Sequence, residues 1–455
     1  MIVQQLYTGC LAEAAYYIES EGEAAIIDPL RETAPYIKMA ERNGAKIKYI
    51  FETHFHADFV SGHVDLAQKT GATIVYGPNA ETGFKSYTAF DGEIFSLGKI
   101  KLKVLHTPGH TLESSCYLLF DETGKESALF TGDTLFIGDV GRPDLAVKSD
   151  LTTQDLAGML YDSLHTKILP LPDDLILYPA HGAGSACGKN MSKETTDTLG
   201  NQKHTNYALK PQHKETFIQN VTADILPAPL YFAQNALMNK KGYENIDEIM
   251  HRGLHALSPE EFETTANQYR ALILDTRQAA VFAEGFIPNA INIGLDGQFA
   301  PWAGALIPDL QQPILLVTDP GKEEESLTRL SRVGYDHVLG YLQGGYKAWA
   351  AAKKETDHIE NISPEKFLAI HPQPSNILDV RKGSEYETGH LANSSNLPLD
   401  YLNDWIHDLD KHKTYFVHCA GGYRSMITCS ILQSRGFEHI VNIEGGYSAL
   451  AKAKE

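Results

Sequence analysis

The chain has 455 residues, of which 43% are hydrophobic and 21% charged, and its formal net charge is −19. At roughly 150 residues per domain this length predicts about three domains, and no apolar run is long enough to suggest a membrane-spanning chain. Lys and Arg are scattered along an acidic chain, which argues against nucleic acid or an anionic membrane as partner and favours small substrates.

The first twenty residues lack a basic segment followed by an apolar run, so we expect no secretory signal and a cytoplasmic protein. The cysteines are widely spaced and include no CxxC pair, so neither a disulfide framework nor a structural zinc site is expected. Each is by default a buried, unreactive free thiol. The five are Cys10, Cys116, Cys187, Cys419 and Cys429.

Residues 1–200 alternate short apolar strands with polar turns and helical stretches. In four segments, a run with strand character ends in a cluster that contains His or Asp. These segments are residues 46–58, 100–111, 128–136 and 175–185. The pattern places the polar clusters on loops at strand ends, where rigid scaffolds commonly carry functional groups.

A lone histidine is more often a structural residue than a ligand, but here several donors share this position. They are His54, His56, Asp58, His110, Asp133 and His181. Imidazole and carboxylate donors without thiolates suit zinc, iron or manganese and argue against a structural zinc knuckle. Because side chains alternate in an extended segment, we expect His54, His56 and Asp58 to project to one side. The sequence predicts a metal site.

The motifs THFHAD, TPGHT, TGDTLF and PAHG resemble, in this order, those of the metallo-β-lactamase superfamily over about the first 185 residues. The resemblance implies an α/β fold, a four-layer αββα sandwich, for residues 1–200. In two-zinc hydrolases of this superfamily, such as glyoxalase II, the matching positions would hold one metal with His54, His56 and His110 and a second with Asp58 and His181, bridged by Asp133. The second metal also needs a histidine directly after the aspartate, and Phe59, which has no donor atom, stands there.

Loss of that ligand leaves two histidines and one carboxylate for a single metal with open positions, the arrangement of non-haem Fe(II) oxygenases. The open positions admit substrate and O2. The resemblance then narrows to the persulfide dioxygenases, whose iron ligands correspond to His54, His110 and Asp133, which implies one Fe(II) per chain. The remaining positions would orient ligands or polarise bound groups, or would merely pack: His56, Asp58 and His181.

This resemblance implies that O2 oxidises the terminal sulfur of a low-molecular-weight persulfide and that hydrolysis yields sulfite and the thiol. The thiol carrier is glutathione, coenzyme A, bacillithiol or another. Arg142, in residues 138–145, would bind a carboxylate of this carrier or pair with Asp144. Cys187 follows His181 in a glycine-rich loop, where its thiol would either accept a sulfane sulfur near the metal or be inert.

Residues 201–255 lose the strand alternation and become polar and mostly helical, which predicts a helical extension and linker. An internal repeat follows, in which residues 273–296 align with residues 377–400 at an offset of 104. The repeat predicts two copies of one α/β domain, residues 256–355 and 360–455. Each copy should contain a small parallel sheet covered on both faces.

In the second copy, a buried strand runs into a short loop from Cys419 to Arg424 and then into a helix. Backbone N–H groups and the positive end of a helix both stabilise a thiolate or persulfide. The C-x4-R spacing resembles the rhodanese family, whereas the related cysteine phosphatases use C-x5-R. Cys419 would carry a sulfane sulfur as a persulfide while the rest of the loop holds sulfite or thiosulfate. The binding groups would be Ala420, Gly421, Gly422, Tyr423 and Arg424. Nearby polar residues, namely Asp379, Arg381 and His390, are expected to hold the domain together, and Cys429 to face its core.

The first copy has Asp319 where the cysteine would stand, and three glutamates, residues 323–325, follow it. Acidic groups repel anions, so we expect this copy to be catalytically silent and to orient the active copy or to help the chain oligomerise. A homo-oligomer, dimer or tetramer, is implied only by family analogy.

The sequence thus predicts a persulfide dioxygenase fused to a rhodanese sulfurtransferase, acting in sulfide detoxification with O2, sulfite and thiosulfate as partners. Both directions of transfer are compatible with the sequence: Cys419 gives sulfur to sulfite, or takes it from thiosulfate to feed the iron. One alternative is a zinc hydrolase of glyoxalase II type with an accessory rhodanese domain. A non-enzymatic alternative is a sulfane-sulfur carrier or sensor.

Overall fold

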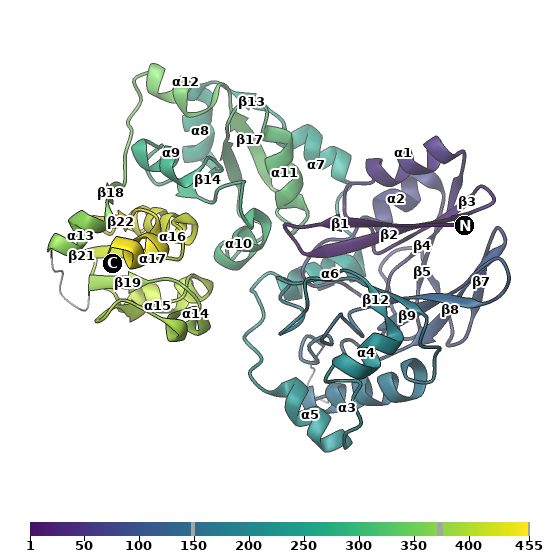
Figure 1. The fold of residues 1–455 in the computed structure, drawn as a ribbon. Coiled ribbons are helices and arrows are strands. Elements are labelled where there is room, and N and C mark those ends of the chain that lie inside the picture. The colour runs from purple at the N-terminus through teal and green to yellow at the C-terminus, as the bar shows by residue number, and fades with distance from the viewer. Residues whose placement is uncertain (147–150, 371–375, 454–455) are drawn as a thin grey trace. The chain divides into compact units, whose positions relative to one another are not determined.

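The computed structural model describes residues 1–146, 151–370 and 376–453. The chain forms two compact units, Met1–Ile246 with Ser331–Gly334, and Asp247–Leu330 with Tyr335–Glu455. Figure 1 labels their helices and strands. None of the helices in the described ranges is both long and apolar enough to cross a lipid bilayer.

The first unit contains two six-stranded mixed sheets. The first sheet, in spatial order, consists of β1 (Ile2–Thr8), β2 (Glu13–Ser20), β3 (Glu23–Ile27), β4 (Lys46–Phe51), β5 (Thr73–Tyr76) and β6 (Tyr87–Thr88). The second, in spatial order, consists of β12 (Asp197–Thr198), β11 (Ile176–Pro179), β10 (Glu126–Gly132), β9 (Ser115–Phe120), β8 (Ile100–His106) and β7 (Ile94–Leu97). In each sheet, hairpin-connected antiparallel strands are joined to parallel ones.

Helices cover the outer faces of these two sheets, as Figure 1 shows. The helices of the first unit are α1 (Ala34–Asn43), α2 (His63–Thr70), α3 (Thr153–Ser163) with a π-helical turn (Leu164–Ile168), α4 (Leu199–Thr205), α5 (Lys214–Thr222) and α6 (Phe232–Lys241), and α7 (Ile246–Gly253) crosses the boundary between the units. Tyr36 and Leu66 of α1 and α2 pack on the first sheet. Leu160 and Phe217 of α3 and α5 pack on the second.

A third apolar layer lies between the sheets, where Phe51 of β4 and Phe130 of β10 belong to one buried cluster and the Phe51 ring packs against Tyr117 of β9, 4.8 Å between centroids. The αββα sandwich expected from the sequence is therefore confirmed. Part of the segment 201–255, expected to be an extension, belongs to this sandwich, because α5 contributes Phe217 and Val221 to the outer core. The prediction that residues 201–255 are mostly helical agrees with α4 to α7.

The second unit contains two five-stranded sheets that are parallel throughout. The first, in spatial order, consists of β13 (Ala256–Leu257), β17 (Val338–Leu342), β16 (Ile314–Val317), β14 (Leu272–Asp275) and β15 (Ile291–Asn292). The second consists of β18 (Glu360–Ile362), β22 (His439–Ile443), β21 (Thr414–His418), β19 (Ile377–Asp379) and β20 (Ser395–Asn396). Corresponding strands occupy the same places, as the internal repeat predicts.

Each sheet of the second unit has its own set of helices. The first copy has α8 (Pro259–Tyr269), α9 (Ala279–Glu284), α10 (Phe299–Leu306), α11 (Glu323–Ser331) and α12 (Gly345–Ala351). The second has α13 (Pro364–Ile370), α14 (Gly383–Thr388), α15 (Leu402–Trp405) between 3-10 turns Leu399–Tyr401 and Ile406–Asp408, α16 (Tyr423–Ser434) and α17 (Gly446–Ala453). Both copies bury an equivalent ion pair, Arg277–Asp275 and Arg381–Asp379, at 2.6 Å from Nη2 to Oδ2 in each.

Candidate functional site

The histidines and aspartates singled out in the sequence lie in loops that follow strands of both sheets in the first unit. His54, His56 and Asp58 follow β4, His110 follows β8, Asp133 follows β10 and His181 follows β11. All six are at most 5% exposed. The sandwich therefore brings polar groups from four separate loops into one buried region.

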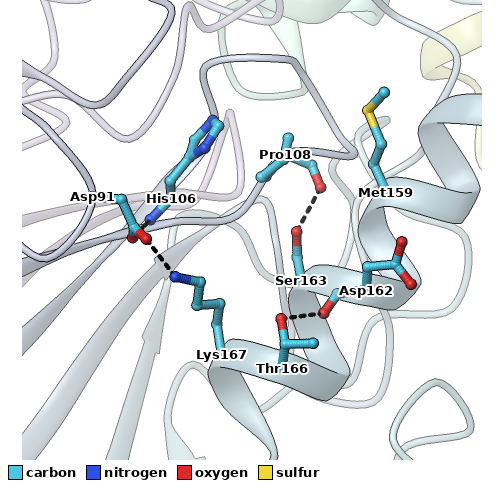
Figure 2. A pocket seen from close by; sticks show the side chains of 8 residues that line it. All are labelled: Asp91, His106, Pro108, Met159, Asp162, Ser163, Thr166 and Lys167. Carbon is cyan, nitrogen blue, oxygen red and sulfur yellow. Dashed lines mark hydrogen bonds and ion pairs between the residues drawn. The ribbon is translucent and has the colours of Figure 1, made fainter.

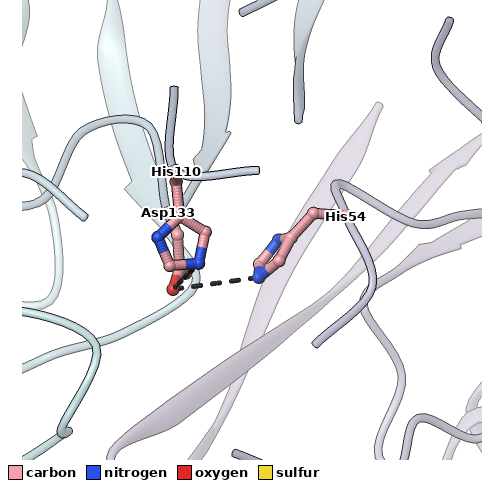
Figure 3. A group of neighbouring side chains, drawn as sticks. All are labelled: His54, His110 and Asp133. Atoms are coloured by element: carbon pink, nitrogen blue, oxygen red, sulfur yellow. Dashed lines mark ion pairs between the residues drawn. The ribbon is translucent and has the colours of Figure 1, made fainter. Parts of the chain in front are cut away.

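His54, His110 and Asp133 form one group of facing donor atoms (Figure 3). The Oδ2 atom of Asp133 lies 3.4 Å from Nε2 of His110 and 3.9 Å from Nε2 of His54. Ligands about 2.1 Å from one metal ion are separated by about 3.0 to 3.4 Å, so a small closure would seat an ion here. Both carboxylate oxygens of Asp133 are buried without a hydrogen-bond partner, which is costly unless a cation binds them.

Hydrogen bonds fix both histidines in the form that a metal needs. Nδ1 of His110 donates to the carbonyl oxygen of Arg142 at 2.8 Å. The Thr53 hydroxyl donates to Asp28 at 2.8 Å, so its oxygen accepts from Nδ1 of His54 at 3.0 Å. In a neutral imidazole with its proton on Nδ1, the free electron pair lies on Nε2, the atom that faces Asp133 in both residues. Burial and the neighbouring imidazoles hold the pKa of His54 well below its ordinary value, which keeps it neutral.

His56 faces a different set of partners. Its Nε2 atom lies 3.1 Å from Oδ1 of Asp28 and 3.6 Å from Oε2 of Glu52. Burial alone would lower the pKa of His56, but the charge and hydrogen bond of Asp28 and the charge of Glu52 outweigh it and raise this pKa to about 10. His56 is thus a buried cation paired chiefly with Asp28, while burial raises the pKa of the Glu52 carboxyl well above its ordinary value. A protonated ring nitrogen has no electron pair to give to a metal.

The extended segment expected after β4 does not form. The strand ends at Phe51, and a loop carries His54, His56 and Asp58. The rings of His54 and His56 remain close, with 4.2 Å between centroids, but His54 groups with His110 whereas Asp58 groups with His181. Side chains from elsewhere in the fold bind the backbone of this loop, namely Asp28, Glu113 and Asn239.

Phe59 occupies the position at which a two-metal hydrolase has another histidine. The ring is fully buried, 4.3 Å from the ring of His56 and 6.5 Å from that of His181 between centroids. Nε2 of His181 lies 3.3 Å from Asp58 Oδ2 and 3.6 Å from Asp133 Oδ1. The other groups of a second metal position are present, but an apolar ring stands among them.

Asn239 of α6 holds the ligand-bearing loop, although no feature of the sequence pointed to it. Its Nδ2 donates to the carbonyl oxygens of His56 at 2.8 Å and Phe59 at 2.7 Å, and its Oδ1 accepts from the N–H of Ser61 at 2.9 Å. Asn239 lies 180 residues after Phe59 and is 1% exposed. One buried amide therefore satisfies three backbone groups of the loop.

Three buried acids near the site were also missed. Asp28 and Glu52 partner His56, as described above. Glu13 of β2 pairs with His181 in an isolated backbone bridge, and both its carboxylate oxygens lack a hydrogen-bond partner. Burial raises the pKa of Glu13 well above its ordinary value, so it is a neutral acid beside the site. Their position at strand ends could have indicated these acids in the sequence. Acidic residues are too common in this chain for that position to single them out.

Arg142 takes one of the two roles considered for it. Its guanidinium donates to both carboxylate oxygens of Asp144, each at 2.7 Å, and Nη2 also donates to the carbonyl oxygen of Leu226 at 2.6 Å. Cys187 lies with Asp133 and His181, its Sγ within 4.8 Å of a donor atom of each. Burial, followed by the charges of neighbouring carboxylates, raises the pKa of the Cys187 thiol well above its ordinary value.

A cavity of about 290 Å³ lies elsewhere in this unit (Figure 2). It is lined by Asp91, His106, Pro108, Met159, Asp162, Ser163, Thr166 and Lys167. Lys167 pairs with Asp91 at 2.5 Å, and the Ser163 hydroxyl donates to the carbonyl oxygen of Pro108 at 2.7 Å. Its polar side chains thus already have hydrogen-bond partners, several of them backbone carbonyl oxygens, and none of the predicted site residues lines it.

The second candidate site is the loop that follows β21. Cys419 is 1% exposed, and the N–H of Gly422 donates to its Sγ at 3.1 Å. Gly422 has a φ of 105°, a left-handed conformation that suits glycine, and it caps the N-terminus of α16. The Cys419 sulfur therefore faces a backbone N–H at the positive end of a helix, which stabilises negative charge.

The guanidinium of Arg424 is already paired and is not free to bind an anion beside the Cys419 sulfur. Its guanidinium pairs with the Glu385 carboxylate through two contacts of 2.6 and 2.7 Å. Anion binding by Arg424 would require this pair to open. Cys429 is fully buried on α16, where burial raises the pKa of its thiol. In the first copy Asp319 is exposed and no cysteine is present.

Comparison with known proteins agrees with this geometry. The Metallo-beta-lactamase superfamily profile matches residues 8–181, and the Rhodanese-like domain profile matches residues 258–352 and 363–453. A probable hydroxyacylglutathione hydrolase of Schizosaccharomyces pombe, glo2, is 34% identical over 34% of this chain and 58% of its own length. Human mitochondrial persulfide dioxygenase ETHE1 is 33% identical over 38% of this chain and 65% of its own length.

The chain thus spans less than two thirds of either relative. A crystal structure described as a metallo-beta-lactamase from Staphylococcus aureus matches with a TM-score of 0.66 and 34% identity, over 75% of this chain and 98% of that one. Because both domain types match in the order in which the structure forms them, the chain belongs to the metallo-beta-lactamase superfamily and carries two rhodanese-like domains after its metallo-beta-lactamase domain.

Proposed function

We propose that the chain is an Fe(II)-dependent persulfide dioxygenase coupled to a rhodanese sulfurtransferase that acts in sulfide detoxification. The observation that carries the proposal is Phe59, an apolar ring at the second-metal position beside a complete single-metal set. Two-metal hydrolysis needs a donor at that position, whereas an oxygenase needs space next to one metal. Similarity to human persulfide dioxygenase supports the proposal.

His54, His110 and Asp133 fit the metal, because their donor atoms converge and the carboxylate is otherwise unpaired. One Fe(II) per chain would bring persulfide and O2 together and activate O2 toward the terminal sulfur. Overall, RSSH, O2 and H2O give RSH, sulfite and two protons. Thr53 and the carbonyl oxygen of Arg142 orient the two imidazoles toward the metal. His56, held by Asp28, supplies fixed positive charge beside the site.

At the second site Cys419 is the nucleophile. Its thiolate attacks the sulfane sulfur of thiosulfate, the S–S bond breaks, and sulfite leaves as Cys419 becomes a persulfide. The reverse step joins this sulfur to sulfite and yields thiosulfate. The Gly422 N–H, 3.1 Å from the sulfur, stabilises negative charge on it in either direction. Sulfite, the product of the first site, is the acceptor at the second, which gives the fusion a chemical purpose.

The expected partners are a low-molecular-weight persulfide, such as that of glutathione or coenzyme A, together with O2, sulfite and thiosulfate. We include in the proposal a cytoplasmic location, which the five unpaired thiols support because a reducing compartment keeps cysteines free. A homo-oligomer is also proposed, by family analogy alone. Similarity to a hydroxyacylglutathione hydrolase favours one competing function, zinc-dependent thioester hydrolysis with an accessory rhodanese domain.

The test is oxygen uptake by the anaerobically iron-loaded full chain on addition of glutathione persulfide, followed with an oxygen electrode. We expect rapid uptake that disappears in an Asp133→Asn variant, because this change removes the anionic ligand at nearly constant shape. Cys419→Ser should leave uptake intact and shift the product from thiosulfate to sulfite. Uptake at the protein-free rate, combined with thioester hydrolysis by zinc-loaded protein, would instead establish the hydrolase.

A further inference from the structure

The silent first copy contacts the active copy at the start of α16, the helix that directly follows the Cys419 loop. Tyr423 is the first residue of α16, and its hydroxyl donates to the carbonyl oxygen of Gly294 in the first copy at 2.7 Å. Further along α16, the Ser430 hydroxyl oxygen accepts from the N–H of Asn292 at 2.9 Å. Both contacts use the end of β15 and the residues directly after it in the first copy.

Residues 294–297 of the first copy form a seat for the Tyr423 ring. A Cβ atom added to Gly297 would lie 2.4 Å from Cζ, 2.6 Å from Cε2 and 2.8 Å from the hydroxyl oxygen of Tyr423. Gly297 does not have a positive φ, so its backbone conformation suits any residue. Glycine is therefore needed at this position to admit the ring. A Cβ at Gly294 would also be tight, 3.2 Å from Cε2 of Tyr423.

The seat acts on the part of the loop that has the most freedom. Gly421 is exposed with open space around it, and Gly422 is left-handed. Two adjacent glycines have many accessible conformations, so a neighbouring anchor limits how far they move. Gly422 supplies the N–H that faces the Cys419 sulfur, and Tyr423 is the next residue. Fixing the tyrosine ring thus fixes the direction of that N–H.

We propose that Tyr423 is a positioning residue through which the silent copy holds the Cys419 loop in its sulfur-binding conformation. The first copy would then be a structural part of the sulfurtransferase site, although it has no nucleophile of its own. Tyr423 acts through Gly422 and does not itself react. This inference rests on the sulfurtransferase activity proposed above.

The test compares Tyr423→Phe with Tyr386→Phe in the full chain. Tyr386 is a matched control, because its hydroxyl also donates to a carbonyl oxygen at 2.7 Å, that of Ser394, but within the active copy. We expect Tyr423→Phe to lower kcat/KM for sulfur transfer from thiosulfate to cyanide about fivefold, the equivalent of one hydrogen bond. The pH profile of Cys419 alkylation by iodoacetamide, read by peptide mass spectrometry, should move to higher pH. Tyr386→Phe should change neither.

A second comparison uses Gly297→Ala in the wild-type and Tyr423→Ala backgrounds. The added methyl displaces the ring, so alone it should reduce transfer at least as much as Tyr423→Phe. The three atoms nearest to the added methyl all belong to Tyr423, so Gly297→Ala should cost much less in the Tyr423→Ala background than in the wild type. Losses that simply add, or equal effects of the two Tyr→Phe changes, would overturn the proposal. If Gly297→Ala does not fold, the Tyr→Phe pair still decides.

The two proposals fail in different ways. A wild-type chain that transfers no sulfur would contradict the sulfurtransferase function, while the alkylation profiles would still report the position of the loop. Normal transfer with identical alkylation profiles for wild type and Tyr423→Phe would refute only the role of Tyr423.

Discussion

Position 59 carries more chemical consequence than its location in a buried loop would suggest. A phenyl ring and an imidazole occupy similar space, but the phenyl ring offers no electron pair. Burying Phe59 contributes about 1.5 to 3 kcal/mol of hydrophobic stabilisation, whereas an imidazole there would need a metal or a hydrogen bond to balance its burial. The neighbouring His56 is already committed to Asp28 and Glu52. We therefore expect one strong metal site per chain.

Phe59→His should add a second metal site. The new imidazole would join Asp58, His181 and Asp133, whose donor atoms already face one another. Metal analysis of zinc-loaded, dialysed protein should give about one ion per wild-type chain and approach two in the variant. Phe59→Leu, which has no donor, is the control and should stay near one. A wild-type stoichiometry of two would contradict the role assigned to Phe59.

Among the elements, α6 stabilises the loop of the candidate metal site, although it contributes no predicted ligand. Its Asn239 satisfies the backbone of the loop that carries His54 and His56. Loops keep a fixed shape only when their buried backbone groups are paired, and this loop borrows its partner from a distant helix. The shape of the ligand-bearing loop therefore depends on residues beyond the matched metallo-beta-lactamase segment, 8–181.

Asn239→Ala should weaken metal binding about 10- to 100-fold, the usual effect of removing a group that orients ligands. It should also lower the free energy of unfolding of the first unit by about 2 kcal/mol, because buried backbone groups lose their partner. Chelator competition and urea denaturation measure the two effects. Asn235→Ala is the matched control, since Asn235 lies one turn earlier on α6, fully buried, with no hydrogen-bond partner for its amide. Equal effects of both substitutions on metal affinity would refute the role of Asn239 in holding the loop.

At the scale of the whole molecule, the chain consists of two compact units with different chemistry. The proposed metal ligands belong to the first unit, and both rhodanese-like copies belong almost entirely to the second. Each unit has its own apolar cores. Because a ligand stabilises only the folded state to which it binds, metal should protect one unit selectively.

Calorimetry of the metal-free chain should therefore resolve two transitions, of which only one moves when metal is added. Metal at 100 times its Kd should stabilise the first unit by about 2.7 kcal/mol and leave the second transition in place. Asp133→Asn should abolish the shift. A single transition that moves as a whole would show instead that the two units unfold together.

The sequence by itself determined the repeated parallel domain and the position of the candidate histidines and aspartates on loops after strands, because strand periodicity and turn residues act over a few positions. The sandwich and the set of His54, His110 and Asp133 were implied by the resemblance of the sequence motifs to known families, and the structure forms this sandwich and brings the three donors together. The proline-containing segment after residue 200 is mostly helical, as the sequence predicts. Its packing on the second sheet was not predicted. The metal, the reaction and the role of each site residue stay predictions.

Only the tertiary structure decided which partner each polar group takes. His56 pairs with Asp28, Arg424 pairs with Glu385, and the Tyr423 ring packs on Gly297. The two members of each pair lie so far apart in the sequence that no periodic pattern could indicate the contact. The same holds for Asn239 and for the division of His54 and Asp58 between two groups of donor atoms. Such contacts are set by how buried donors and acceptors satisfy one another once the layers have packed, and that matching exists only in the folded chain.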